Sequence, residues 1–261
     1  MTRSKKNYLI QLAQILPKIQ RRMPSRIERS RFWARLEDGL YARGLLSGKN
    51  GKEIWDSFHR SDSPQEWYAF AGKTFPAHQQ RDEILGFLSL ATLQSPRIVM
   101  EIGTAQSGTN FLLGQTMDSV EMLIAMDLRV RNIHLLNQFS RSELTRVVLE
   151  GSSYAPSTYE RVKKVLSGRP LDVLFIDGDH TYNGVKADYQ MYRPLVRKGG
   201  LIAFHDIVDD HHTKYGRPGL GWSGGVPKFW RELKLQGEFS SCSEFIAEPD
   251  QDGMGIGVLQ I

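Results

Sequence analysis

Carboxylates and imidazoles follow two apolar runs of the chain, at the point where each run ends. Asp177, Asp179 and His180 follow one run, and His205 and Asp206 follow the other. If both runs are strands of one parallel sheet, their carboxyl ends meet at the edge where such sheets bind ligands. The cluster suits either a general base or an oxygen-rich site for a divalent cation. The structural alternative is that these side chains only cap helices.

A third apolar run leads into a glycine-containing turn, Glu101-Ile-Gly-Thr-Ala-Gln-Ser-Gly108. Gly103 and Gly108 permit a tight turn and a close approach of the backbone to a ligand. Ala105 and Gln106 stand where a dinucleotide-binding turn would have its second glycine. The turn therefore predicts a nucleotide-like ligand but does not favour NAD(P).

Polar residues also end the next two predicted strands. Asp127 can accept hydrogen bonds from both ribose hydroxyls of an adenosine. Ser152 and Ser153 are small enough to border an adenine. Ser107 and Thr109 are expected to cap the helix that follows the glycine turn.

Apolar strands and amphipathic helices alternate along most of the chain, which predicts a parallel sheet with right-handed crossovers. A short link joins two C-terminal strands, which favours an antiparallel pair at the sheet edge. We therefore expect an α/β fold, a Rossmann-like, doubly wound, seven-stranded sheet that is mostly parallel, with a helical N-terminal extension. The predicted strands are 97–102, 122–127, 146–150, 172–177, 200–205, 239–247 and 254–261, and the helices between them are 108–117, 131–141, 155–167 and 184–195.

The composition is that of an ordinary soluble protein, with 261 residues, 40% hydrophobic and 24% charged. No apolar run approaches the roughly 18 residues that a membrane helix needs. Cys242 is the only cysteine, so an internal disulfide and a cysteine-based zinc site are excluded, and a cytoplasmic protein is expected. Cys242 alternates with polar residues in a predicted strand, and we expect it to pack in the core.

The first part of the chain differs from the rest in charge. Residues 1–35 hold ten Lys or Arg and one acid, while the whole chain carries a net +5, so the remainder is acidic. A nucleic-acid substrate is therefore not expected. We expect residues 1–75 to form a basic helical arm and cap, and residues 76–261 the main domain. The arm is predicted to pack on the body or on a second subunit, with a membrane-surface helix or a transit peptide as alternatives.

The ordered set of motifs resembles a known superfamily. The glycine turn, Asp127, Phe175-Ile-Asp-Gly-Asp-His-Thr-Tyr182 and Gly199-Gly-Leu-Ile-Ala-Phe-His-Asp206 are similar to class I S-adenosylmethionine-dependent methyltransferases. Within that superfamily they look like the cephalosporin-hydroxylase-like and sugar O-methyltransferase-like branch, as does Gly225-Val-Pro-Lys-Phe-Trp230. The resemblance covers residues 76–261.

This resemblance implies methyl transfer from S-adenosylmethionine to a hydroxyl of a small molecule or sugar. It implies that the methionine end of the cofactor lies along the glycine turn, that Asp127 holds the ribose, and that Ser152 or Ser153 borders the adenine. The cofactor-binding set so predicted is Glu101, Gly103, Thr104, Ala105, Gly108, Asp127, Ser152, Ser153 and Asp177. Gln79 or Gln80 matches a glutamine that precedes the first strand in this branch.

At the reacting end, the resemblance implies His205, Asp177 and His180 as catalytic groups. Related enzymes bind Mg²⁺ or another divalent cation here, and Asp177, His205 and Asp206 match their ligand positions. His205 stands where some relatives have an acid, so a metal-free histidine base remains the alternative.

The glycine-rich stretch 209–225 is expected to be a mobile loop that covers the substrate, with Tyr215 and Trp222 near the acceptor. His211 and His212 are not expected to share an ion. Two other functions stay open: an NAD(P)-dependent oxidoreductase, and a non-catalytic binding protein with this fold.

Overall fold

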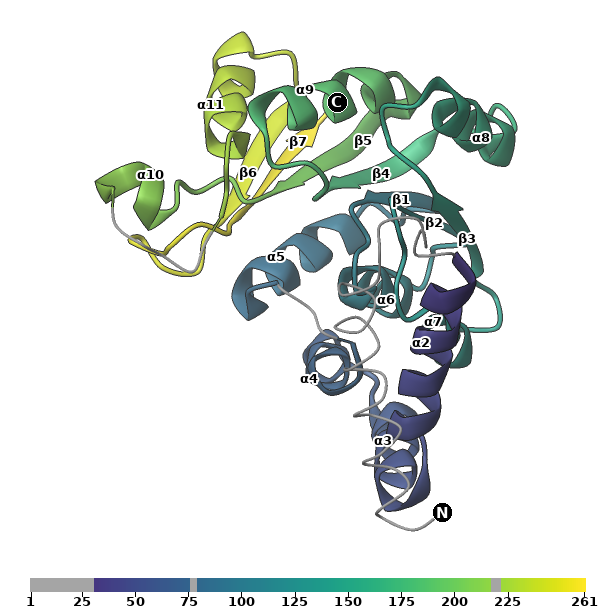
Figure 1. The fold of residues 1–261 in the computed structure, drawn as a ribbon. Coiled ribbons are helices and arrows are strands. Elements are labelled where there is room, and N and C mark those ends of the chain that lie inside the picture. Colours follow the sequence, from purple (N-terminus) through teal and green to yellow (C-terminus); the bar gives the residue numbers. More distant parts are fainter. Residues whose placement is uncertain (1–30, 76–78, 217–221) are drawn as a thin grey trace, which may run out of the picture.

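One seven-stranded sheet runs through the molecule (Figure 1). The structure is a computed structural model that describes residues 31–75, 79–216 and 222–261. The strands are β1 (Ile98–Ile102), β2 (Met122–Asp127), β3 (Thr145–Glu150), β4 (Leu171–Ile176), β5 (Val196–His205), β6 (Ser241–Phe245) and β7 (Ile256–Gln260). Their order in the sheet is β3-β2-β1-β4-β5-β7-β6.

The first five strands are parallel, and β7 is antiparallel to both β5 and β6. The order of the strands reverses between β1 and β4, which is where ligands bind in sheets of this kind. The predicted fold class is therefore confirmed, including the antiparallel C-terminal pair.

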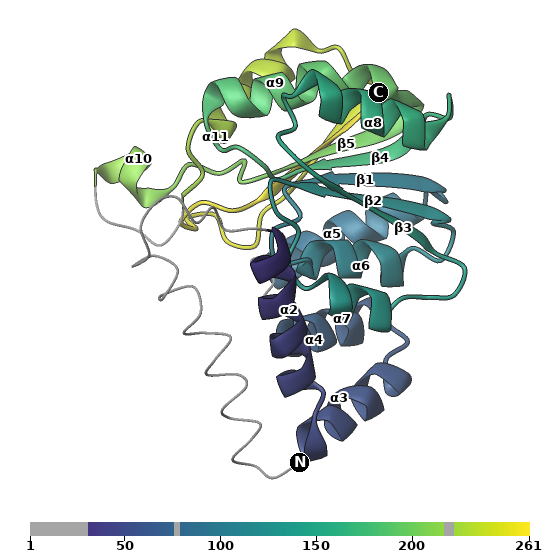
Figure 2. The same ribbon diagram turned by 45° about the vertical axis from the view of Figure 1, so that its right-hand side comes forward.

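Helices cover both faces of the sheet (Figure 2). One face carries α8 (Pro156–Leu166), α9 (Tyr182–Tyr192) and α11 (Val226–Gln236). The other carries α5 (Arg81–Thr92), α6 (Gly108–Thr116) and α7 (Ile133–Gln138), with α2 (Arg31–Leu45), α3 (Gly48–Arg60) and α4 (Pro64–Thr74) outside them. The short helix α10 (His211–Tyr215) and the 3₁₀ turn η1 (Arg193–Leu195) complete the described elements.

The helices of the N-terminal extension share the core of the sheet domain. Phe70 of α4 lies 5.2 Å from Phe111 of α6 and 5.1 Å from Phe139, measured between ring centroids. Helix α4 begins with a capping box, because Ser63 and Glu66 satisfy each other's backbone amides. Aromatic burial of this extent fixes α4 against the sheet domain.

Several local predictions were wrong. The helix predicted at 131–141 is shorter, and two helices, α10 and α11, follow β5 where no helix was predicted. Cys242 is exposed and does not pack in the core, because β6 is an edge strand that pairs with β7 alone. The predicted amphipathic helix of the arm lies outside the described residues, so its packing and membrane roles stay predictions. Among the described helices none is long and apolar enough to cross a membrane.

Candidate active site

A cavity of about 680 Å³ opens beyond the carboxyl ends of the parallel strands. It extends from the ends of β2 and β3, across the turn after β1, to the ends of β4 and β5. Its walls are Ile102, Gly103, Ala105, Met126, Asp127, Leu128, Gly151, Ser152, Ser153, Tyr154, Asp177, Gly178, Asp179, His180, His205, Asp206, Trp222 and Met254. Residues that the sequence assigned to a cofactor and to chemistry therefore line one space.

The turn after β1 is pressed against the end of β4. Gly103 has a φ of +91°, and a Cβ there would lie 1.9 Å from the carbonyl oxygen of Asp177. Its amide donates a 2.8 Å hydrogen bond to the carbonyl of Met126. No side chain fits at this position, so glycine is required where these loops meet.

Asp127 closes this turn from the end of β2. Its Oδ2 accepts a 2.9 Å hydrogen bond from the amide of Ala105, and its Oδ1 accepts one of 2.9 Å from the amide of Arg129. Ser152 and Ser153 follow β3 on the next stretch of wall. The carboxylate is thus held by two backbone amides while it faces the cavity.

Three of the predicted cofactor residues lie behind the wall rather than in it. Glu101 is 1% exposed and accepts a 3.0 Å hydrogen bond from Nδ2 of Asn110, and burial raises its pKa to about 7. Thr104 is buried, and Gly108 is buried as the first residue of α6.

The prediction that Ser107 caps α6 with its side chain was wrong. Ser107 occupies the position before the helix with a φ of +74°, and its hydroxyl donates to the carbonyl of Arg131 instead. The side chain therefore ties the glycine turn to the loop after β2.

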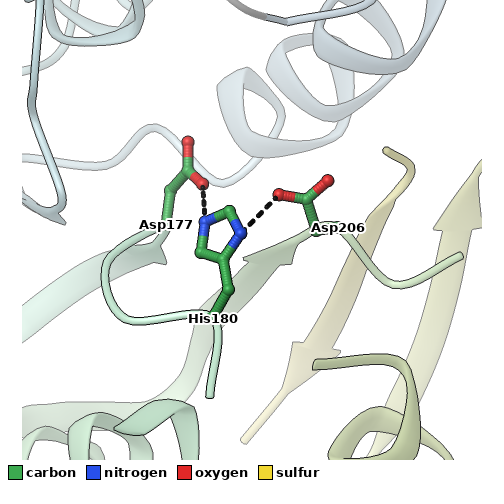
Figure 3. Close-up of side chains that lie close together, drawn as sticks. All are labelled: Asp177, His180 and Asp206. Carbon is green, nitrogen blue, oxygen red and sulfur yellow. Dashed lines mark ion pairs between the residues drawn. The ribbon is translucent and has the colours of Figure 1, made fainter. Parts of the chain in front are cut away.

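The predicted acid and histidine cluster is assembled at the ends of β4 and β5. The ring of His180 lies between two carboxylates, with Nε2 3.5 Å from Oδ1 of Asp177 and Nδ1 3.4 Å from Oδ2 of Asp206 (Figure 3). His205 contacts the same oxygens, since its Nδ1 lies 3.3 Å from Asp177 and 3.0 Å from Asp206. Both imidazoles thus share both carboxylates.

This sharing controls the charges of the cluster. Burial alone would lower the pKa of each imidazole, but the neighbouring Asp177 and Asp206 carboxylates outweigh it. They raise the pKa of His180 to about 9 and hold the pKa of His205 well above its usual value. Burial would likewise raise the pKa of Asp177, yet the two histidines lower it.

Asp177, His180 and Asp206 offer ligand atoms that all lie within 4.8 Å of one another. This set differs from the predicted metal ligands in having His180 in place of His205. The Nε2 atom of His205 is buried and has no hydrogen-bond partner among the described residues. Asp179 lines the cavity, but its Oδ1 also accepts a 2.8 Å hydrogen bond from the amide of Thr181 at the start of α9.

Of the two aromatic residues predicted near the acceptor in the segment after β5, Trp222 lines the cavity and Tyr215 does not. Trp222 stacks on His180, with ring centroids 5.2 Å apart, and its carbonyl lies 2.8 Å from Nδ1 of that ring. Tyr215 does not line the cavity, and its hydroxyl contacts Asp250. His211 contacts the loop at Asp252 and takes no part in the cluster.

Sequence reasoning missed Leu128, Tyr154 and Met254, which line the cavity from loops. An apolar residue in a loop carries no periodic signal, so nothing in the sequence distinguishes these three. Gln79, rather than Gln80, contacts the cluster, because its Nε2 donates a 3.0 Å hydrogen bond to Oδ2 of Asp177.

Comparison with known proteins agrees with this geometry. Residues 100–207 match a family model described as a methyltransferase domain. A rhamnosyl O-methyltransferase of Mycobacterium tuberculosis is 29% identical over 134 residues, which are 51% of this chain and 53% of that protein. An uncharacterized protein of Acanthamoeba polyphaga mimivirus is 31% identical over 144 residues, 53% of this chain and 62% of that protein. The chain thus spans little more than half the length of these relatives.

Solved structures share the fold at low identity. An O-methyltransferase from Bacillus cereus, in complex with S-adenosylhomocysteine, has a TM-score of 0.57 and 18% identity, covering 80% of this chain and 96% of that one. An O-methyltransferase of tomaymycin synthesis from Streptomyces achromogenes, in complex with S-adenosylmethionine, has a TM-score of 0.52 and 15% identity, covering 77% and 91%. Residues 100–207 of the chain thus match a methyltransferase domain, and the chain shares its fold with solved O-methyltransferases.

Proposed function

We propose that the protein transfers a methyl group from S-adenosylmethionine to a hydroxyl of a small molecule or sugar, assisted by a divalent cation. The observation that carries the proposal is the single cavity that joins the Asp127 loop to the acid and histidine cluster. A cofactor in one part of this cavity would present its methyl group to an acceptor in the other. The lone cysteine favours a reducing, cytoplasmic setting for this reaction.

In this proposal Asp127 binds the ribose. Each of its oxygens accepts one hydrogen bond from a backbone amide. Because a carboxylate can accept about four hydrogen bonds, it can also accept those of two ribose hydroxyls. Ser152 and Ser153 would border the adenine. Gly103 and Ala105 would approach the methionine end directly, while Glu101, Thr104 and Gly108 would support that turn from behind.

The cluster fits a divalent cation in its donor set. Two carboxylates and one imidazole converge from three loop positions, a combination that suits Mg²⁺ or Mn²⁺. A cation there would polarise the acceptor hydroxyl and lower its pKa. Asp177, His180 and Asp206 would hold it.

His205 would remove the proton of the hydroxyl. Its Nδ1 faces the carboxylates of Asp206 and Asp177, which favours the tautomer with the proton on Nδ1 and leaves Nε2 as the acceptor. A base must be neutral, whereas these carboxylates favour the charged imidazole. Positive charge bound by the carboxylates would offset that effect and return the pKa of His205 toward its usual range.

The acceptor would lie against Trp222. This side chain is 67% exposed, lines the cavity and stacks on His180, so it presents an aromatic face beside the cluster. An aromatic face of this kind suits the apolar side of a sugar or a phenolic ring. Similarity to rhamnosyl O-methyltransferases supports a sugar hydroxyl.

Calorimetric titration of the purified chain with S-adenosylhomocysteine and S-adenosylmethionine tests the cofactor, with NADH as the control. Micromolar binding of the sulfur ligands without NADH binding is expected. Turnover with rhamnose-containing and phenolic acceptors should then fall on chelation and return with Mg²⁺ or Mn²⁺. Failure of both sulfur ligands to bind would overturn the proposal, and chelator-resistant turnover would remove the cation from it.

A further inference from the structure

Three charged residues of α2 reach across to the loops that follow β2 and β3. Arg35 pairs with Glu150 at 3.2 Å, at the end of β3. Asp38 and Glu37 both pair with Arg131 after β2, at 2.8 Å and 3.3 Å. Figure 2 shows the first turns of α2 beside these loops. The contacts cross more than 90 residues of sequence.

The pairs of α2 with the loop after β2 are largely shielded from water. The side chains of Glu37 and Asp38 are 5% and 2% exposed, and those of Arg129 and Arg131 are 27% and 26% exposed. Glu37 also binds Arg129 at 3.2 Å. A buried carboxylate is costly unless it is paired, so these four charges constrain one another strongly.

Asp38 also reaches the backbone of this loop. Its Oδ2 accepts a 3.3 Å hydrogen bond from the amide of Asn132, a residue with a φ of +57°. Left-handed backbone is costly for residues other than glycine and persists only where the surroundings enforce it. The carboxylate of Asp38 supplies part of that enforcement.

The constraint continues from Arg131 into the glycine turn. The amide of Arg131 donates a 2.9 Å hydrogen bond to the carbonyl of Ala105, and the hydroxyl of Ser107 donates to the carbonyl of Arg131. Ala105 and Ser107 also have positive φ values, +42° and +74°. The amide of Ala105 is the one that binds Asp127. A chain of direct contacts therefore leads from Asp38 to Asp127, the residue proposed to bind the ribose.

We propose that Glu37 and Asp38 are positioning residues that preset the nucleoside end of the cavity for its ligand. They act through Arg131, which holds the turn after β1 and the loop after β2 at a fixed separation. The N-terminal extension then forms part of the cofactor site rather than an independent cap. This inference rests on the proposed function, because the ligand it concerns is the nucleoside of S-adenosylmethionine.

Asp38→Asn and Glu37→Gln in the full chain test the inference. Measured at a temperature well below the melting temperature of the variant, the Kd for S-adenosylhomocysteine should rise roughly tenfold in each case. At saturating cofactor, kcat should stay at the wild-type value, because the cluster at Asp177 is untouched. The matched control is Glu53→Gln on α3, whose carboxylate is 63% exposed and pairs with Lys49 in a surface contact. It should leave the Kd unchanged.

Hydrogen exchange of the cofactor-free protein gives a second reading. The amides of Ala105, Arg129 and Arg131 should exchange faster in Asp38→Asn than in Glu53→Gln, since their acceptors are no longer held in place. If Asp38→Asn fails to fold, Glu37→Gln decides the question by the same measurements.

The outcomes separate the two proposals. If the wild-type chain binds S-adenosylhomocysteine and the variants keep its Kd and its exchange rates, the positioning role is overturned and the proposed function is not. A lowered melting temperature with an unchanged Kd also overturns it, because the ion pairs would then be structural only. If the wild-type chain does not bind the ligand, the proposed function fails, and this inference fails with it.

Discussion

The side-chain amide of Gln79 donates a 3.0 Å hydrogen bond to Oδ2 of Asp177, a residue 98 positions away. The other oxygen of that carboxylate, Oδ1, faces both His180 and His205. Gln79 is 5% exposed and lies just before α5. The amide therefore fixes the rotation of the carboxylate, so that one oxygen is directed to the two imidazoles.

We expect Gln79→Leu to reduce kcat roughly tenfold while the Kd for S-adenosylhomocysteine stays near the wild-type value. The reason is that the carboxylate of Asp177 loses the group that orients it, whereas the Asp127 end of the cavity is unaffected. Gln80→Leu is the matched control, because Gln80 is exposed and its side chain does not cap α5. Equal turnover of the two variants would show that Asp177 needs no such support.

Asp127→Asn is expected to weaken binding of S-adenosylhomocysteine by roughly 10- to 100-fold, the loss typical of charge-assisted hydrogen bonds. The NH₂ group of the asparagine also repels one of the two backbone N–H groups that donate hydrogen bonds to Asp127 in the wild type. Titration calorimetry measures the effect, with Asp118→Asn at an exposed site as the control. Wild-type affinity in Asp127→Asn would remove this residue from the ribose role.

His205→Gln should leave the Kd for S-adenosylhomocysteine unchanged and reduce kcat about 100-fold or more, the usual contribution of a general base. Glutamine keeps a polar side chain of similar reach but cannot take up a proton at neutral pH. His212→Gln, at an exposed position, controls for the loss of a histidine. Turnover close to that of the control would assign proton removal to another group.

The arrangement of strands was predictable because it depends on local patterns. The runs around Ile124 and Phe175 are apolar without interruption, as is typical of buried parallel strands, and the run around Met100 is broken by Glu101 alone. Acidic residues directly after such runs predict a shared site, and the structure brings Asp177 and Asp206 together at neighbouring strand ends.

The contacts between distant loops were not predictable in the same way. Cys242 lies on an edge strand, and its exposure depends on which strand lies outermost, a property that alternation of side chains does not encode. The pairing of Asp38 with Arg131 depends on how α2 packs against the sheet. A charged residue on a helix does not indicate in the sequence which distant residue it will pair with. Sequence reasoning therefore finds the ends of the strands but not the side chains that fix the loops.

Asp188 gives the chain a stability that depends on pH. This carboxyl lies on α9 with no exposed surface. Burial raises its pKa from 3.8 to about 6, and the nearby Asp179 carboxylate adds to the shift. The folded chain therefore binds a proton here more tightly than the unfolded chain does.

The sign of the effect follows from that difference. The contribution of Asp188 to the free energy of unfolding is fully present below pH 3.8 and is lost as the pH rises through about 6. Asp188→Asn lacks this titration, so the wild type should lose about 2 kcal/mol relative to the variant between pH 4 and pH 7.5. Thermal or urea unfolding of both proteins across this range measures the difference. Asp118→Asn, at an exposed site, should run parallel to the wild type at every pH. A constant gap between wild type and Asp188→Asn would mean that the buried carboxyl keeps its ordinary pKa.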